Sequence, residues 1–504
     1  MTEIRLQLLT SRRQRDGDKS KKPTVISKRI IARNAAALMV SEVGVRVFSA
    51  IGVVLVARSL GPRAYGVLSV ALALSGIVAY LSDLGLTHLT IQHATRPNAD
   101  MGCILGTIFK VRLVLVIGVA LASLAGILVL YPEPEQRAVM LAVVLPSIGG
   151  VAMQGFAASY FWATQELHVT AGLKTASQVL SAIALILAFF LRWPVRGVAA
   201  VYGTTSLLGG IACLWLVRRR APKMGGWDPG ILKGLTAFTV GGLTGIALPQ
   251  LGPLIMERVT AATEVGYFAA ASRIPGLLYA IPGCLGMAWY PQLFLAGSRD
   301  HAQHFALCVD QLKINAILSF GLSLPVALYS GLLIRTVLGS SWEAPTAPIL
   351  SLLCWMVVLN SLSSPFADAL TTKGLQTRRA CVYVAALAIG SVLFAALAST
   401  RGALGAAAAA IITQTLLSIG LVVVNPSGRA LLLTAGQRFL RSICLASACV
   451  FVIHMLLPDS LISAALSVAT FFLVAVASDI ELRTVASRVA NIVYAKWRYA
   501  CATP

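Results

Sequence analysis

The stretch ARSLGPRAYG, residues 57–66, separates two apolar runs near 31–57 and 66–86. A helix needs about 20 residues to cross the roughly 30 Å of hydrocarbon in a bilayer, and each run is long enough. The polar, basic stretch between the two runs is then a loop at one membrane surface. The same alternation of apolar spans and short polar loops continues along the chain, so we expect a protein that crosses the membrane many times.

Composition supports this interpretation. Of the 504 residues, 57% are hydrophobic and only 12% are charged. A soluble domain cannot hide that much apolar surface, whereas a bilayer can. We predict an all-α polytopic membrane protein with about fourteen transmembrane helices. The remaining spans are expected near 106–130, 138–162, 170–191, 196–217, 234–256, 265–290, 308–331, 346–368, 378–399, 402–424, 439–457 and 460–477.

The spans group into two six-helix lobes followed by two C-terminal helices. We expect a basic, disordered cytoplasmic tail at 1–30, a first lobe at 31–217, a basic linker at 218–233, a second lobe at 234–424, two extra helices at 425–477 and a second tail at 478–504. A weak internal repeat supports the two lobes. Arg58 and Gly66 recur as Arg258 and Gly266, each before a long apolar span, as in a transporter built from repeats.

Positive charge is concentrated in every second loop. This asymmetry is the positive-inside signature, and it predicts that both termini are cytoplasmic. The net charge of +22 does not indicate nucleic-acid binding, because the cations sit at helix ends and not on one basic face. Attraction to anionic lipid on the cytoplasmic side explains the excess.

Four of the charged residues within the predicted spans are candidate site residues. A charge at the bilayer centre costs roughly 2.5–3.5 kcal/mol, so such residues usually face a cavity or a partner. We predict that Arg46 and Arg273 bind an anionic substrate and that Glu42 and Asp83 are candidates for coupling to an ion. Alternatively, Glu42 and Arg46 form a salt bridge with each other at their i, i+4 spacing, and Asp83 lies at the interface.

Two further acidic residues lie near the ends of predicted spans, and proline and glycine are concentrated within two of the spans. Asp368 and Glu257 lie near predicted span ends, where we expect them at the interface. Helix breakers gather at 241–253 and 275–286, and freed carbonyl groups at membrane depth are tolerated where they are buried or line a cavity. These two spans therefore point to the transport path, although close helix packing explains the glycines equally well.

Motifs for enzymatic chemistry are absent from the sequence. There is no G-x-x-x-x-G-K-[ST], H-E-x-x-H or G-x-S-x-G pattern, and none of the nine cysteines forms C-x-x-C. The external loops are too short for a catalytic domain. We expect a transporter with no cofactor and no metal site, whose transport is coupled to H⁺ or Na⁺.

Several short motifs carry a resemblance to a known family. The R-x-L-G-P-x-x-Y-G run at 58–66, followed by Asp83-Leu84-Gly85, resembles the opening of bacterial polysaccharide transporters, the oligosaccharide flippases. Gly266-Tyr267-Phe268 with Arg273-Ile274-Pro275 looks like the start of the second lobe, and 370–374 also fits. The superfamily with this pattern also holds multidrug exporters and lipid II flippases.

The resemblance implies a function and a location. Such proteins move undecaprenyl-pyrophosphate-linked oligosaccharides to the outer leaflet of the bacterial inner membrane, through a cationic cavity between two six-helix lobes. The products are O-antigen (lipopolysaccharide), capsule or exopolysaccharide, and a polymerase and chain-length machinery are possible partners besides the membrane lipids. Alternatives are a cation-coupled multidrug or small-metabolite exporter, a lipid II flippase, and a membrane enzyme such as a polymerase or ligase.

Overall fold

The computed structural model describes residues 28–94, 100–164, 166–221, 224–232, 235–458, 460–479 and 483. Residues 1–44 and 45–504 form separate compact units. The first unit contributes the beginning of helix α2 (Lys28–Leu81), and the side chains of residues 28–48 lie outside the described part. All contacts discussed for the helices and for the cavity lie within the second unit.

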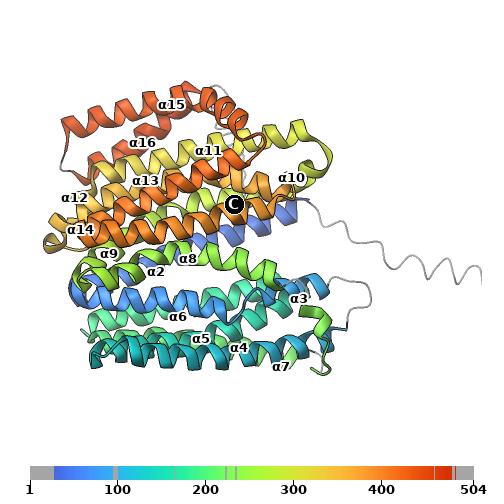
Figure 1. Ribbon diagram of the computed structural model, residues 1–504. Coiled ribbons are helices and arrows are strands. Elements are labelled where there is room, and N and C mark those ends of the chain that lie inside the picture. The colour runs from blue at the N-terminus through green and yellow to red at the C-terminus, as the bar shows by residue number, and fades with distance from the viewer. Residues whose placement is uncertain are drawn as a thin grey trace, which may run out of the picture. The chain divides into compact units, whose positions relative to one another are not determined.

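The described residues are helical throughout, apart from short connections, and contain no strand (Figure 1). After α2, the first group of helices consists of α3 (Leu86–Ala94), α4 (Met101–Leu130), α5 (Pro134–Ala163), α6 (Leu167–Phe190) and α7 (Val195–Arg220). A short 3₁₀ turn, η1 (Pro229–Leu232), precedes the second group. The second group consists of α8 (Leu235–Val259), α9 (Ala262–Leu278), α10 (Ala280–Arg299), α11 (His301–Leu328), α12 (Ser330–Val337), α13 (Ser340–Thr372), α14 (Gln376–Val424), α15 (Gly428–Leu456) and α16 (Leu461–Ser478).

Ten of the described helices are long and apolar enough to cross a membrane, and eleven if the bent pair α9–α10 is one span. The expected all-α polytopic membrane fold is confirmed. Two very long helices are each broken in the middle, α2 at Gly61 and α14 at Arg401 and Gly402. A glycine adopts the positive φ of these breaks, +75° and +56°, without the strain of a side chain. Each of these long helices is two helices joined at a kink, so the structure is consistent with the predicted count of about fourteen.

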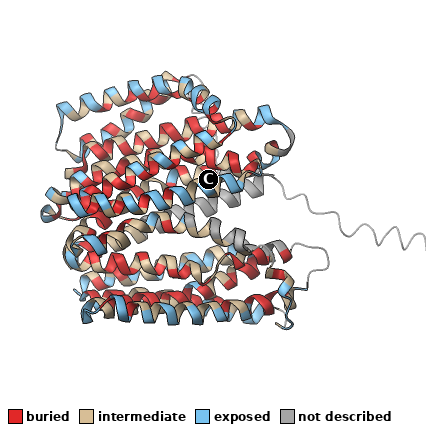
Figure 2. Cartoon of the chain, in the orientation of Figure 1, coloured by how far each residue is buried: buried red, intermediate tan, exposed pale blue. Residues whose placement is uncertain are grey.

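The helices begin and pack as membrane helices do. Asp100 and Asp300 cap α4 and α11, and each carboxylate accepts hydrogen bonds from two backbone N–H groups of the first turn. In the first group α5 packs against α3, α4, α6 and α7, and in the second α13 packs against α9, α11 and α14. Figure 2 shows buried residues along the inner helices and exposed residues on the outer ones.

The outer helices expose apolar side chains. On α4, Val114, Leu121 and Val129 are 70%, 62% and 79% exposed. Continuous apolar surface of this kind is unfavourable in water and favourable against lipid. Basic residues gather at the end of the bundle where α7 stops at Arg220 and α13 stops at Thr372, which we call the basic end. The opposite end, where α4 stops at Leu130 and α8 at Val259, is called the far end.

Candidate functional site

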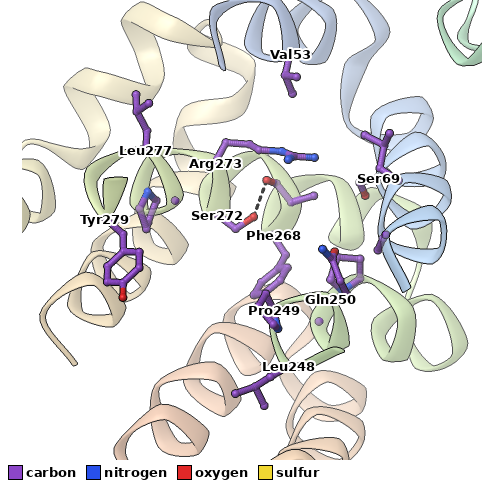
Figure 3. A pocket seen from close by; sticks show the side chains of 18 of the residues that line it. Val53, Ser69, Leu248, Pro249, Gln250, Phe268, Ser272, Arg273, Leu277 and Tyr279 are labelled. Atoms are coloured by element: carbon purple, nitrogen blue, oxygen red, sulfur yellow. Dashed lines mark hydrogen bonds between the residues drawn. The ribbon is translucent and has the colours of Figure 1, made fainter. Parts of the chain in front are cut away.

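A cavity of about 800 Å³ lies between the two groups of helices (Figure 3). Its wall is formed by α2, α5, α6 and α7 from the first group and by α8, α9, α13 and α14 from the second. The helix breakers predicted to mark the transport path contribute to this wall, among them Pro249, Gly252 and Pro275. The broken spans therefore face the cavity, as irregular backbone at membrane depth must do when it is not packed against protein.

Arg273 is the one charged residue among the described residues that line the cavity. Its Nε donates a hydrogen bond of 3.2 Å to the Tyr65 hydroxyl, which comes from the other group of helices. Within the described part of the chain, no carboxylate lies within ion-pair distance of it. An unpaired guanidinium in a cavity at membrane depth is ready to bind an anion, because it has unused donors in a fixed planar arrangement.

The rest of the wall is neutral. Hydroxyl and amide side chains come from both groups of helices, and large apolar side chains fill the surface between them. The polar members that face the cavity include Ser69, Ser75, Gln178, Gln250, Asn360 and Gln414. Uncharged donors and acceptors spread around a single cation suit a large polar ligand that carries one anionic group.

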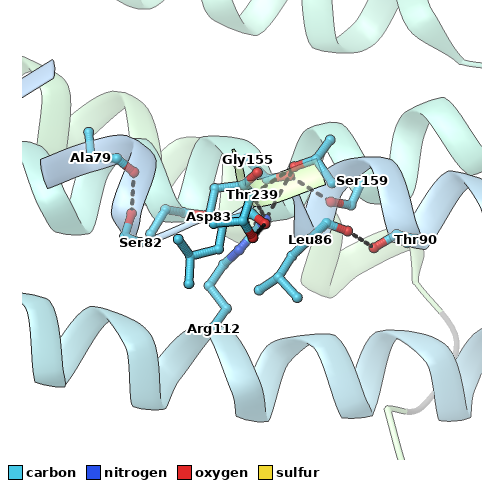
Figure 4. A network of polar contacts seen from close by, with 12 residues as sticks. Ala79, Ser82, Asp83, Leu86, Thr90, Arg112, Gly155, Ser159 and Thr239 are labelled. Atoms are coloured by element: carbon cyan, nitrogen blue, oxygen red, sulfur yellow. Dashed lines mark hydrogen bonds and ion pairs between the residues drawn. The ribbon is translucent and has the colours of Figure 1, made fainter. Parts of the chain in front are cut away.

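Asp83 lies outside the described cavity wall. Its carboxylate forms an ion pair with the Arg112 guanidinium of α4, whose side chain is 4% exposed (Figure 4). Thr87 donates a hydrogen bond of 2.8 Å to the same carboxylate oxygen, and the second guanidinium nitrogen of Arg112 donates one of 3.3 Å to the Ala152 carbonyl. Gly155 lies beside the pair, since a Cβ at that position would be in ordinary contact with both charged groups at 3.4 Å.

We expect Asp83→Asn to destabilise the protein by about 3 kcal/mol, because it leaves the Arg112 charge buried without its partner. The measurement is the melting temperature of the purified protein in detergent. The double substitution Asp83→Leu with Arg112→Met removes both charges and should restore most of that temperature. If Asp83 instead couples transport to an ion, the double variant will be stable but unable to export.

The side chains of Glu42 and Arg46 lie outside the described residues. Arg273 and Asp83, the other two predicted residues, are not brought together. Sequence reasoning overlooked Arg112, which lies about three turns inside α4. A signal existed, since an arginine followed by a long apolar run needs a partner at membrane depth.

The two groups of helices contact each other at the far end through a pair of glycines. A Cβ on Gly66 would lie 1.9 Å from the Ala262 carbonyl oxygen, and a Cβ on Gly266 would lie 2.0 Å from the Pro62 carbonyl oxygen. The contact is reciprocal and follows the 200-residue repeat. Small residues permit such close backbone approach between membrane helices.

Aromatic and polar side chains extend the far-end contact. Trp342 packs edge-on against Tyr65 and Tyr267, with ring centroids 6.4 and 5.8 Å away. Farther out, the Tyr131 hydroxyl donates a 2.8 Å hydrogen bond to Glu257. Burial and the neighbouring Glu257 carboxylate raise the pKa of the Tyr131 hydroxyl, which therefore remains a donor at all physiological pH values.

A smaller contact joins the groups at the basic end. The Thr239 hydroxyl of α8 donates to the Leu84 carbonyl at 2.8 Å, and the Tyr80 hydroxyl donates to the Thr239 carbonyl at 3.3 Å. The cavity thus lies between a tightly packed contact at the far end and a hydrogen-bonded contact at the basic end.

Comparisons with known proteins agree with this architecture. Residues 31–295 match the family of polysaccharide biosynthesis proteins. A Shigella flexneri protein named as an O-antigen transporter is 22% identical over 393 residues, which cover 70% of this chain and 87% of that protein.

Solved structures with the same fold are transporters. The lipid II flippase MurJ in an inward closed conformation has a TM-score of 0.69 at 13% identity, over 90% of this chain and 99% of that one. An inward-facing multidrug resistance MATE transporter of the MOP superfamily has a TM-score of 0.65 at 13% identity, over 77% and 95%. The chain belongs to the family of polysaccharide biosynthesis proteins.

Proposed function

We propose that this protein moves lipid-linked oligosaccharide repeat units, carried on a polyprenyl pyrophosphate such as undecaprenyl pyrophosphate, from the cytoplasmic to the outer leaflet. The observation that carries the proposal is Arg273, which pairs with no carboxylate and is the one charged group among the described lining residues of a polar cavity of about 800 Å³. The guanidinium would hold the pyrophosphate, and the hydroxyl and amide groups of the wall would solvate the sugars. Arg46 is proposed as a second ligand of the anion.

The physical task fits these groups. A glycan cannot cross hydrocarbon unaided, and a pyrophosphate diester carries about two negative charges. With the cytoplasm negative, outward movement of each negative charge is favoured by roughly 2.3 kcal/mol per 100 mV. Inward flow of H⁺ or Na⁺ would add to this driving force, and Glu42 and Asp83 remain candidates for that coupling.

We infer an alternating-access cycle in which the two contacts between the helix groups open in turn. The basic end would face the cytoplasm of a bacterial inner membrane with both termini on that side, in line with the positive-inside rule. The domain boundaries expected from the sequence, with lobes at 31–217 and 234–424, are proposed as the moving parts. A polymerase and a chain-length protein in the outer compartment would take up the product.

Deletion of the gene from its host tests the proposal. Lipid-linked oligosaccharides are extracted from the cells, and surface polysaccharide is stained in parallel. We expect repeat units to accumulate on the cytoplasmic face and surface polymer to be lost, with recovery of both on re-expression. Unchanged lipid pools and polymer, in a host without a second such transporter, would contradict the proposal. Lysis on depletion would instead indicate lipid II as substrate, and altered drug tolerance would indicate a small-molecule exporter.

A further inference from the structure

A polar layer lies inside the second group of helices, between α11 and α13. Gln311 and Asn315 are one turn apart on α11, and they face Asp368 and Ser361 of α13. Gln311 Nε2 donates a 2.8 Å hydrogen bond to Asp368 Oδ2, and Asn315 Nδ2 donates one of 3.2 Å to the Ser361 carbonyl. Ser364 donates to Asp368 Oδ2 at 3.3 Å. The pairing shows that the two helices run antiparallel through this layer.

The carboxylate of this layer has no cationic partner. No lysine, arginine or histidine among the described residues lies within 4.0 Å of Asp368. Arg379, whose positive charge is near enough to interact with Asp368, donates its 2.8 Å hydrogen bond to the Thr371 hydroxyl instead. A carboxylate held by neutral donors in a membrane bundle is costly unless a cation or proton joins it.

Three buried oxygen atoms in the same layer lack a hydrogen-bond partner. They are Gln311 Oε1, Asn315 Oδ1 and the Ser361 hydroxyl oxygen, on residues that are 0%, 1% and 0% exposed. The amide orientations are fixed, because the NH₂ group of each amide donates to an oxygen acceptor. Each unmet acceptor costs about 1–3 kcal/mol, so a layer that keeps three of them favours a bound cation or an ordered water that meets them.

The layer adjoins the cavity. Asn360, next to Ser361 on α13, lines the cavity, and so does Tyr279 at the break between α9 and α10. Gly286 of α10 packs against the layer. A Cβ at this position would lie 3.5 Å from Gln311 Nε2 and 3.7 Å from the Ser364 hydroxyl. Since α9 and α10 are bent by 41° at their break, movement there would change how α10 covers the layer.

We propose that this layer binds one Na⁺ ion, with the Asp368 carboxylate and the free oxygens of Gln311, Asn315 and Ser361 as ligands. Hard cations prefer carboxylate, amide and hydroxyl oxygens. One monovalent ion neutralises one carboxylate, whereas a divalent ion would leave a net positive charge at membrane depth. A proton would neutralise Asp368 but would leave the other three oxygens unpartnered. The role of the ion in driving export rests on the proposed function, whereas binding itself does not.

The test is equilibrium binding of ²²Na⁺ to the purified full-length protein in detergent, at constant ionic strength with choline chloride. We expect saturable binding of about one ion per chain, displaced by unlabelled NaCl. Asp368→Asn should abolish it. Asp310→Asn should leave it unchanged, because Asp310 is an exposed acid on the same helix and pairs with Arg438 at the surface. Absence of saturable binding to the wild type, or binding retained in Asp368→Asn, would overturn the proposal.

A milder variant separates ion binding from folding. Ser361→Ala removes an unpartnered buried hydroxyl, so it should not lower the melting temperature measured in choline chloride. It should nevertheless weaken Na⁺ binding about tenfold, a change that a merely structural serine would not produce. If both variants bind Na⁺ as the wild type does, the site is refuted. Loss of surface polymer on gene deletion without Na⁺ binding refutes the ion site alone, and Na⁺ binding without a change in glycan pools refutes the flippase alone.

Discussion

Arg273→Ala is expected to reduce export of surface polysaccharide by about 100-fold without loss of the protein from the membrane. The substitution removes the one charged group among the described cavity residues and leaves a neutral wall. A charge-assisted, bidentate contact to a phosphate is worth about 3 kcal/mol, which corresponds to roughly two orders of magnitude in rate or affinity. The measurement is surface polymer per cell, with membrane abundance of each variant checked by immunoblot.

Two companion variants define the role of this arginine. Arg273→Lys keeps the charge but loses the planar, two-pronged geometry, so we expect export between that of the wild type and that of Arg273→Ala. Arg335→Ala is the matched control, because Arg335 is exposed on α12 and away from the cavity wall. Normal export by Arg273→Ala, with the control also normal, would remove Arg273 from the proposed site.

Tyr65 connects this binding group to the far-end contact. Its hydroxyl accepts the hydrogen bond from Arg273 Nε, and its ring packs on Trp342. An anion that engages Arg273 would compete with this hydrogen bond, so substrate binding could loosen one of the interactions that hold the helix groups together. We expect Tyr65→Phe to keep the buried aromatic packing but to remove this competitor for the Arg273 guanidinium, measured as a lowered KM with a smaller change in kcat.

Much of the fold follows from the sequence alone, for a simple physical reason. Hydrocarbon forces every span to be apolar and helical, so composition and length reveal the spans directly. The break at Gly61 lies in a predicted loop, and the break at Arg401 and Gly402 lies where one predicted span gives way to the next. The repeat of Gly66 at Gly266 is the contact between the helix groups. The sequence could not reveal that Gly66 packs against Ala262 and that Gly266 packs against Pro62. Contacts between distant spans depend on three-dimensional packing, which no local pattern shows.

The site was predicted less completely. Arg273 was recognised because an arginine inside a span is rare. Asp368 was expected at the interface because it lies near a span end, and it does lie one turn before the end of α13, where it is bonded to Gln311 of α11 and to Ser364. Its partners are more than fifty residues away or one turn along the helix, and no local pattern marks the antiparallel pairing that brings them together. Polar residues within spans therefore need the fold before a role can be assigned.

Gly266→Ala is expected to cause the second large effect, a loss of stability of about 2 kcal/mol together with a loss of most export. The added Cβ would lie 2.0 Å from the Pro62 carbonyl oxygen, so the two helices must separate by about 1 Å to admit it. Separation would weaken the far-end contact and favour the state that is open there. Gly66→Ala should behave alike, since its Cβ would meet the Ala262 carbonyl oxygen.

The direction in which cavity labelling changes shows whether Gly266→Ala shifts the transport cycle toward the state open at the far end or only misfolds the protein. A single cysteine at Ser272 in the cavity wall, in a variant whose nine native cysteines are replaced by serine, reports access from the far end through labelling with an impermeant thiol reagent. Gly266→Ala should raise that labelling. Gly118→Ala on α4 is the matched control, because nothing lies within 4 Å of its added Cβ and alanine favours the helix. Unchanged stability, labelling and export in Gly266→Ala would mean that the far-end glycines do not close the path, whereas lower stability with unchanged labelling would mean that they serve packing alone.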